Sequence, residues 1–295
     1  MSKYVPDISS HRWVIISPQR TYRPSDVFQP RTTKKKCPFC PGNEAQTPDT
    51  VLRYNKYGHE KDPWVVRVIP NKYPITDLHE VIIHSPDCER DIEDLSAFQV
   101  SLIFKAYRQR YQFYRSRGQV IIFCNHGEHA GASLEHPHSQ LVVIPPQINL
   151  DALAREPMNN LIYSNTYFNV YCPDFSQWPY ETWVAPKKEG TLFGDISDEE
   201  IDDLVEILQR LLKQLRKIYI KNQHTLLPFD YNYYIYPKEN WYLRLIPRFV
   251  HRAGFELGTG LHVNIIDPSQ AALELQGMER KMAGVISRLK KAKDG

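Results

Sequence analysis

Two histidines stand two residues apart in the chain, as His136-Pro137-His138. In an extended segment, side chains two positions apart project to the same side. One imidazole of such a pair could bind a metal ion while the other acts as a nucleophile, because imidazole is both a common metal ligand and a reactive base. The alternative is a pair of hydrogen-bonded surface histidines, since so short a motif has low specificity.

Cysteines provide a second chemical signal. Cys37 and Cys40 form a Cys-x-x-Cys knuckle followed by Gly42, a spacing that lets two thiolates bind one tetrahedral zinc ion. A redox-active pair is the rival interpretation, but no strand–helix unit follows it, as a thioredoxin-like site would need. A closed structural zinc site requires two further ligands, and Cys88 and His136 are the candidates.

Two further segments could bind phosphate. Arg20 and Arg23 lie three residues apart in a proline-bounded loop, and guanidinium groups match the oxygens of phosphate. The glycine-dense residues 253–260 could bring backbone N–H groups close to a ligand. Each segment has an ordinary alternative, an exposed loop for the arginines and a simple turn for the glycines.

Length and composition limit the possible classes of protein. The chain has 295 residues, 42% of them hydrophobic, which is enough for one large domain or two moderate ones. A net charge of +3 gives no reason to expect nucleic-acid binding. No apolar run is long enough to span a membrane, and residues 1–12 lack the apolar stretch of a signal peptide. Five cysteines with one close pair favour a reducing cytoplasm and a metal site over disulfides.

The elements that must position these residues follow from periodicity. Ser96 with Gln99, and Ser197 with Glu200, mark the N-terminal caps of two helices with apolar residues at helical spacing. Short apolar runs predict strands at residues 12–17, 64–69, 79–84, 120–124, 141–144, 180–186, 231–236 and 243–247. The two histidines therefore stand directly before a strand.

The second half of the chain repeats the plan of the first. Each half gives a strand, a capped helix and two further strands, in the same order and at nearly the same spacing. Where the first copy has His136 and His138, the second has Lys238 and Asn240, so only the first should keep the chemistry. We expect an α+β fold of two copies with mainly antiparallel sheets packed against helices, divided into residues 1–170 and 171–295.

Together these motifs resemble the galactose-1-phosphate uridylyltransferase family, which belongs to the histidine-triad superfamily and is built from two such repeats. The resemblance covers nearly the whole chain, and several motifs in matching order are more specific than any one of them. It rests on residues 12–24, 37–44, 70–74, 85–87, 136–140 and 253–260. Ser139 and Gly258-Thr259-Gly260 are similar to the branch that also contains ADP-glucose phosphorylase.

The resemblance implies roles for the matching residues. His138 corresponds to the nucleophile, and Gln140 to the residue that hydrogen-bonds the phosphoryl oxygens. Triad hydrolases have a third histidine at the position of Gln140, so glutamine favours transfer over hydrolysis. The residues that match substrate-binding positions are Arg20, Arg23, Asn71, Asn125, Ser133, Ser139, Gln140, Gly254, Phe255, Glu256 and Gly258.

The resemblance also implies a structural zinc ion. Cys37, Cys40 and His136 match zinc ligands of the family. Its fourth ligand is usually a histidine, and here Cys88 stands at that position. Because thiolate is a sound tetrahedral ligand, we expect a site of three cysteines and one histidine.

The activity that the resemblance implies is exchange of UMP between a UDP-hexose and a hexose 1-phosphate through a covalent nucleotidyl-histidine. The alternatives are an ADP-sugar phosphorylase or adenylyltransferase, a histidine-triad nucleotide hydrolase, and a zinc-stabilised binding protein without catalysis. The resemblance further implies a homodimer, in which Phe255 and Glu256 reach the hexose in the partner's active site. We expect a cytoplasmic enzyme that has neither a nucleic-acid nor a membrane partner.

Overall fold

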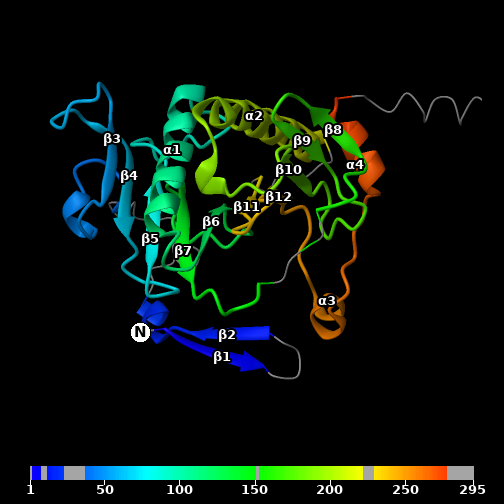
Figure 1. The fold of residues 1–295 in the computed structure, drawn as a ribbon, viewed down its shortest axis with the longest axis horizontal. Coiled ribbons are helices and arrows are strands. Elements are labelled where there is room, and N and C mark those ends of the chain that lie inside the picture. The colour runs from blue at the N-terminus through cyan, green and yellow to red at the C-terminus, as the bar shows by residue number, and fades with distance from the viewer. Residues whose placement is uncertain are drawn as a thin grey trace, which may run out of the picture.

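The computed structural model describes residues 2–7, 12–22, 37–150, 153, 155–221 and 229–277. Within these residues the chain forms one ten-stranded antiparallel sheet and a separate two-stranded hairpin (Figure 1). The hairpin consists of β1 (Lys3–Asp7) and β2 (Arg12–Ile16). The strands of the large sheet are β3 (Leu52–Asn55), β4 (Trp64–Pro70), β5 (His79–Ile83), β6 (Gln119–His126), β7 (His138–Ile144), β8 (Leu161–Ser164), β9 (Phe168–Tyr171), β10 (Thr182–Pro186), β11 (Tyr231–Ile235) and β12 (Leu243–Pro247). The helices are α1 (Ala97–Tyr114), α2 (Asp198–Lys221), α3 (Gly254–Thr259) and α4 (Pro268–Leu275).

The large sheet consists of two copies of one five-stranded arrangement. The first half has the order β3-β4-β5-β7-β6, and the second half, read from the opposite edge, has the order β8-β9-β10-β12-β11. The copies meet at β6 and β11, where Cys124 pairs with Tyr233. This arrangement confirms the expected α+β fold of two repeats. The division into residues 1–170 and 171–295 stays a prediction; β8, which precedes that boundary, pairs with β9 in the second half of the sheet.

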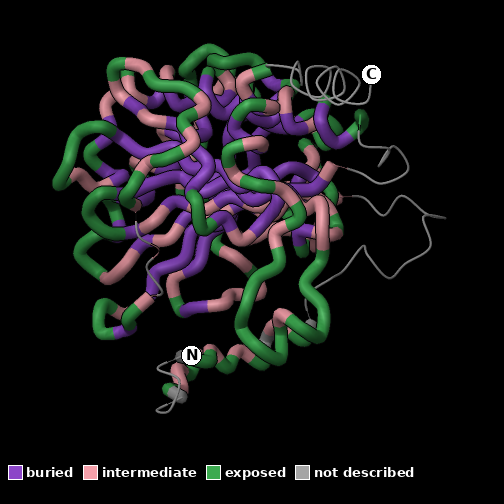
Figure 2. The backbone as a smooth tube through the Cα atoms, turned by 90° about the vertical axis from the view of Figure 1, so that its right-hand side faces the viewer, coloured by how far each residue is buried: buried purple, intermediate pink, exposed green. Residues whose placement is uncertain are grey.

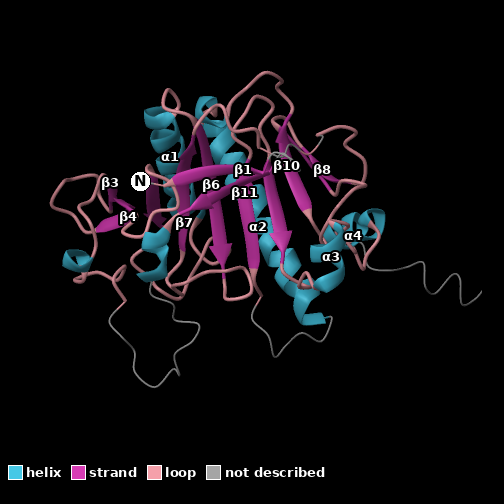
Figure 3. Ribbon diagram, turned by 90° about the horizontal axis from the view of Figure 1, so that it is seen from below, coloured by secondary structure: helices cyan, strands magenta, loops and turns pink. Residues whose placement is uncertain are grey.

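The helices α1 and α2 cover one face of the sheet (Figures 1 and 3). Ser96 caps α1 by accepting the N–H of Gln99 at 3.2 Å, but the Gln99 side chain donates to backbone carbonyls elsewhere, so the expected capping box is half formed. At α2 the box is complete, because Ser197 and Glu200 each accept the other's backbone N–H. Apolar residues of both helices pack with those of β6, β7, β11 and β12 in a single core.

The opposite face of the sheet carries the hairpin and several loops. β1 and β2 lie across this face (Figure 3), and Tyr4 packs there against the buried cluster of Val142, Ile144 and Ile148. Buried residues concentrate in the sheet and its helices, whereas exposed residues follow the loops (Figure 2). Among the described residues, none of the helices combines the length and apolarity that a membrane span requires.

Candidate active site

The strand β7 begins at His138, three residues earlier than the sequence predicts, because pairing with β5 on one side and β6 on the other extends it. Val81 of β5 and Phe123 of β6 lie opposite Gln140. Successive side chains of a strand point to opposite faces. His138 and Gln140 therefore share the face away from the helices, and the residue between them points toward the helices.

A cavity of about 650 Å³ opens on this face. Its volume lies within the range of small-molecule and cofactor sites, roughly 300–1,000 Å³. The walls come from the Cys-x-x-Cys knuckle, the short 3-10 helix η3 (Glu44–Gln46), the end of β4, the loop before β7, and β7 itself. The lining residues are Cys37, Pro38, Phe39, Ala45, Gln46, Thr47, Pro48, Ile69, Pro70, Asn71, Lys72, Tyr73, Val81, Ser133, Leu134, His138 and Gln140.

His138 is buried at the wall of this cavity, with 7% of its surface exposed. Its Nδ1 lies 2.8 Å from the carbonyl oxygen of His136, and a carbonyl can only accept a hydrogen bond. The proton of the neutral ring is therefore on Nδ1 and the lone pair is on Nε2. Phe39 packs edge-on against the ring, with 5.4 Å between the ring centroids. An imidazole held in this tautomer is arranged to act as a nucleophile or a base through Nε2.

Three of the expected zinc ligands meet beside the cavity. The Sγ atoms of Cys37 and Cys40 lie 3.7 and 3.6 Å from Nδ1 of His136, and the three ligand atoms all lie within 4.8 Å of one another. His136 Nε2 donates to the carbonyl oxygen of Ser85 at 2.8 Å, which leaves the Nδ1 lone pair directed toward the two sulfur atoms. Two thiols and an imidazole in this orientation fit the donors that tetrahedral zinc prefers.

Cys88, the expected fourth ligand, is exposed and is not part of this three-residue group. Its thiol has that of Cys40 as a neighbour, and partial burial together with this neighbour raises the pKa of Cys88. Cys88 is therefore beside the group without completing it, and its coordination to zinc stays a prediction.

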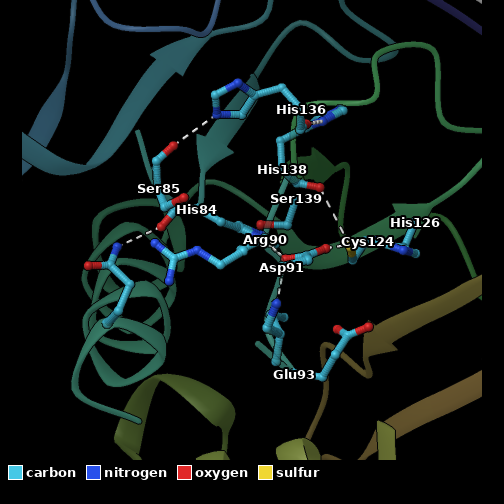
Figure 4. A network of polar contacts seen from close by, with 12 residues as sticks. His84, Ser85, Arg90, Asp91, Glu93, Cys124, His126, His136, His138 and Ser139 are labelled. Atoms are coloured by element: carbon cyan, nitrogen blue, oxygen red, sulfur yellow. Dashed lines mark hydrogen bonds and ion pairs between the residues drawn. The ribbon is translucent and has the colours of Figure 1, made fainter. Parts of the chain in front are cut away.

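Behind the site, a buried polar network connects the segment after β5 with β6 and β7 (Figure 4). Asp91 is at its centre, with one carboxylate oxygen 2.7 Å from His84 Nδ1 and the other 2.9 Å from His126 Nδ1. The hydroxyl of Tyr107 lies 3.3 Å from His84 Nε2 and donates to Ser139 Oγ at 2.7 Å. Although burial opposes ionisation, the two histidines hold the pKa of Asp91 well below its usual range.

Comparison with known proteins identifies the relatives of this fold and site. A profile described as "Domain of unknown function (DUF4931) N-terminal domain" matches residues 21–146. The chain is 27% identical to ADP-glucose phosphorylase of Arabidopsis thaliana, over 90% of each protein. It is 23% identical to galactose-1-phosphate uridylyltransferase of Thermotoga maritima, over 90% of this chain and 95% of that protein.

The fold agrees with these similarities. The crystal structure of the Arabidopsis ADP-glucose phosphorylase with bound ADP-glucose matches with a TM-score of 0.69 at 24% identity, covering 94% of this chain and 99% of that one. Over nearly its whole length the chain is thus similar to galactose-1-phosphate uridylyltransferases and to ADP-glucose phosphorylase. These similarities support an enzyme activity of the nucleotidyltransferase or phosphorylase type.

Part of the substrate-binding set implied by the family lies at the cavity. Asn71 and Ser133 line it together with Gln140. Arg20, on the 3-10 helix η1 (Pro18–Tyr22), donates from Nη1 to the carbonyl oxygen of Tyr73, a lining residue, at 3.1 Å. Arg23 lies outside the described residues.

Ser139 and Asn125 are placed differently. Ser139 is fully buried, and its hydroxyl accepts from Tyr107 on the helix-covered face, so its expected role as a side chain that binds substrate is not supported. The reason is the strand alternation that separates it from both neighbours. Asn125 lies near the end of β6, where its Oδ1 accepts from Asn232 Nδ2 at 2.9 Å, and it is not among the described residues that line the cavity.

The residues that the family places at the hexose lie on α3, which stands apart from the sheet (Figure 1). Among the described residues that line the cavity, none comes from α3. Gly254, Phe255, Glu256 and Gly258 are all exposed or partly exposed, and Phe255 is 55% exposed. Within a single chain, α3 therefore does not line the cavity that contains His138.

Sequence reasoning assigned no chemistry to His79, yet this residue contacts Gln140. His79 Nε2 lies 3.0 Å from Gln140 Oε1, and both side chains are buried. The available signal was the period of two in the predicted strand 79–84, which places His79 on the same face as Val81. This periodicity predicts a contact with Gln140 only when β5 is known to pair with β7.

Proposed function

We propose that the protein transfers a nucleotidyl group by double displacement through a covalent nucleotidyl-His138. The tautomer of His138 carries this proposal, because the Nδ1–H donates to His136 O at 2.8 Å, which places the ring lone pair on Nε2, and the residue lines a cavity large enough for a nucleotide. Similarity to a uridylyltransferase and a nucleotide-sugar phosphorylase supports the same chemistry.

In the first step, Nε2 of His138 attacks the α-phosphorus of a nucleotide-sugar. A phosphorus–nitrogen bond forms, the bond between phosphorus and the bridging oxygen breaks, and a sugar 1-phosphate leaves with that electron pair. The proton stays on Nδ1, where the carbonyl of His136 stabilises the charge on the ring. In the second step, an oxygen of a phosphate acceptor attacks the same phosphorus and the neutral imidazole is released.

Because phosphate is already a good leaving group, positioning and charge stabilisation supply most of the catalysis. Gln140 would hydrogen-bond the phosphoryl oxygens, and Arg20 and Arg23 would complement their negative charge. Asn71 and Ser133 are the proposed nucleotide contacts on the cavity wall. Zinc held by Cys37, Cys40 and His136, with Cys88 as the fourth ligand, would brace the segment that leads to His138.

The first proposed donor is a UDP-hexose, with a hexose 1-phosphate as acceptor. An ADP-hexose with inorganic phosphate as acceptor is the second candidate. It is favoured by the higher identity to the ADP-glucose phosphorylase, 27% against 23% for the T. maritima uridylyltransferase. Both donors would use the same displacement at His138 and differ in the base.

Intact-protein mass spectrometry tests this function. The protein is incubated with UDP-glucose or, separately, with ADP-glucose, and we expect one donor to add the mass of one UMP or AMP. Adding galactose 1-phosphate or inorganic phosphate should then remove that mass. His138→Ala should gain no mass. His59→Ala is the control and should still gain it, because His59 is exposed and is not among the described residues that line the cavity. A nucleotidyl adduct on His138→Ala would show that the nucleophile is a different residue.

A further inference from the structure

We infer that His79 is a positioning residue that orients the amide of Gln140 so that only its NH₂ group faces the transferred phosphoryl group. The inference rests on the proposed function, because it names the group that prepares Gln140 for that reaction. His79 lies on the first position of β5, and its side chain is 4% exposed.

The orientation of the His79 ring follows from a backbone group. The N–H of Ile75 points at His79 Nδ1 at 2.9 Å, and a backbone N–H can only donate. Nδ1 is therefore the acceptor nitrogen, and in the neutral ring the proton is on Nε2. A second backbone bond, from Asn71 N–H to the carbonyl oxygen of His79 at 2.8 Å, holds the loop against the strand.

The ring in turn orients Gln140. With its proton on Nε2, His79 donates to Gln140 Oε1 at 3.0 Å. Oxygen and nitrogen of a glutamine amide are otherwise interchangeable in shape, so the donor decides which one faces His79. Asn71 Nδ2 lies 3.1 Å from the same His79 Nε2, and its Oδ1 accepts the N–H of Tyr73, so a second donor group faces the ring nitrogen there. An amide NH₂ cannot accept the ring proton, which leaves Gln140 Oε1 as its acceptor.

The consequence is chemical. Gln140 lines the cavity beside His138, and with Oε1 held by His79 its NH₂ group is the part directed to a ligand. The phosphoryl oxygens carry negative charge, which increases around the phosphorus during displacement, so a fixed donor stabilises the transition state. A reversed amide would instead present its oxygen and repel the same group.

The test compares His79→Phe, His79→Gln, Gln140→Ala and the double variant His79→Phe/Gln140→Ala. The measurement is the single-turnover rate of nucleotidyl-enzyme formation, together with the Kd of the nucleotide-sugar. Loss of one such donor lowers rates by roughly 10²-fold, so we expect His79→Phe to lose about 10- to 100-fold in rate with a Kd changed less than about 3-fold. His79→Gln, whose Nε2 can replace the ring Nε2–H, should recover most of the rate.

The double variant separates positioning from a general structural role. If His79 acts through Gln140, adding His79→Phe to Gln140→Ala should cause no further loss of rate. Thr182→Val is the matched control, because its buried hydroxyl donates to the backbone carbonyl of Tyr180, before β10, and this variant should keep the wild-type rate. Independent, multiplying losses in the double variant, or a full rate in His79→Phe, would overturn the inference. Absence of any adduct on the wild-type enzyme would instead reject the proposed function.

Discussion

At the scale of single residues, backbone carbonyls give the two motif histidines opposite tautomers. The carbonyl of Ser85 holds the proton of His136 on Nε2, so its Nδ1 can bind metal. The carbonyl of His136 holds the proton of His138 on Nδ1, so its Nε2 can attack. Two identical side chains two positions apart thus acquire different chemistry from the groups that accept their protons.

The pair of Asp91 and His126 should make stability depend on pH. Burial by itself lowers the pKa of His126. The hydrogen bond with Asp91 and the negative charge of that carboxylate outweigh burial and raise the pKa of His126 above its ordinary value. A raised folded-state pKa gives stability that is fully present below the unfolded value of about 6.5 and is lost as pH rises through the folded value. We expect the free energy of unfolding to fall by roughly 1 kcal/mol as pH rises from about 6.5 through the raised folded-state pKa of His126.

Urea denaturation at a series of pH values measures this dependence. His126→Gln should flatten the fall, because glutamine can keep a neutral hydrogen bond but has no charge to lose. His59→Gln, at an exposed histidine, is the control that should keep the wild-type slope. An equal slope in His126→Gln and the wild type would assign the pH dependence to other groups.

At the scale of elements, β11 of the second half and Asp230, the residue before it, brace the loop between β6 and β7. Asp230 Oδ2 accepts the N–H of His129 at 2.7 Å, and Asn232 Nδ2 donates to the carbonyl oxygen of Ala130 at 2.8 Å. Gly127 opens this loop with a φ of +85°, and a Cβ there would overlap the carboxylate of Asp230. The half that has Lys238 and Asn240 in place of the two histidines thus shapes the loop that leads to β7.

Two glycines with nearly the same backbone test this contact. Gly58 has a φ of +87° and nothing within 4 Å of its Cβ position. Gly58→Ala should therefore cost only about 1 kcal/mol, the strain of a left-handed residue. Gly127→Ala should cost about 3 kcal/mol or more, because overlap with Asp230 adds to that strain. Urea unfolding of both variants gives the comparison, and equal losses would mean that the loop moves away from Asp230 at little cost.

At the scale of the whole molecule, the segment expected at the hexose is exposed instead of lying in its own cavity. Phe255, Leu257 and Leu261 are 55%, 77% and 61% exposed. Apolar side chains grouped on a surface mark interaction sites. We propose that the homodimer implied by the resemblance buries this segment and gives each cavity the residues that its own chain does not bring there.

Leu257→Asp should therefore shift the protein from dimer to monomer without unfolding it, since a buried unpaired carboxylate at an interface is costly. Sedimentation velocity measures the assembly, and circular dichroism checks the fold. Leu161→Asp, at a 45% exposed leucine on the edge strand β8, is the control that should leave the dimer intact. A wild-type monomer, or a dimeric Leu257→Asp, would contradict the proposed assembly.

The elements with strong local patterns could be read from the sequence. The strands β4, β5, β6 and β12, both capped helices and the repeat of the two halves all appear where periodicity predicts them. The short strands β3 and β8 carry no such pattern because they are only partly buried, so their place follows from the strands beside them. The motif residues of the site were also recognisable, because Cys37, Cys40 and His136 have types and spacings that only a few chemistries use.

The pairing of strands that are distant in the sequence decides which side chains of the site contact one another. Ser139 and Gln140 are neighbours of similar polarity, and the pairing of β7 between β5 and β6 sends one to Tyr107 and the other to His79. The periodicity of apolar and polar residues shows which side chains share a face of a strand. It does not show which distant strand, carbonyl or N–H lies opposite each residue. Those distant groups set the tautomers, the amide orientation and the shape of the loop, and with them the chemistry of the site.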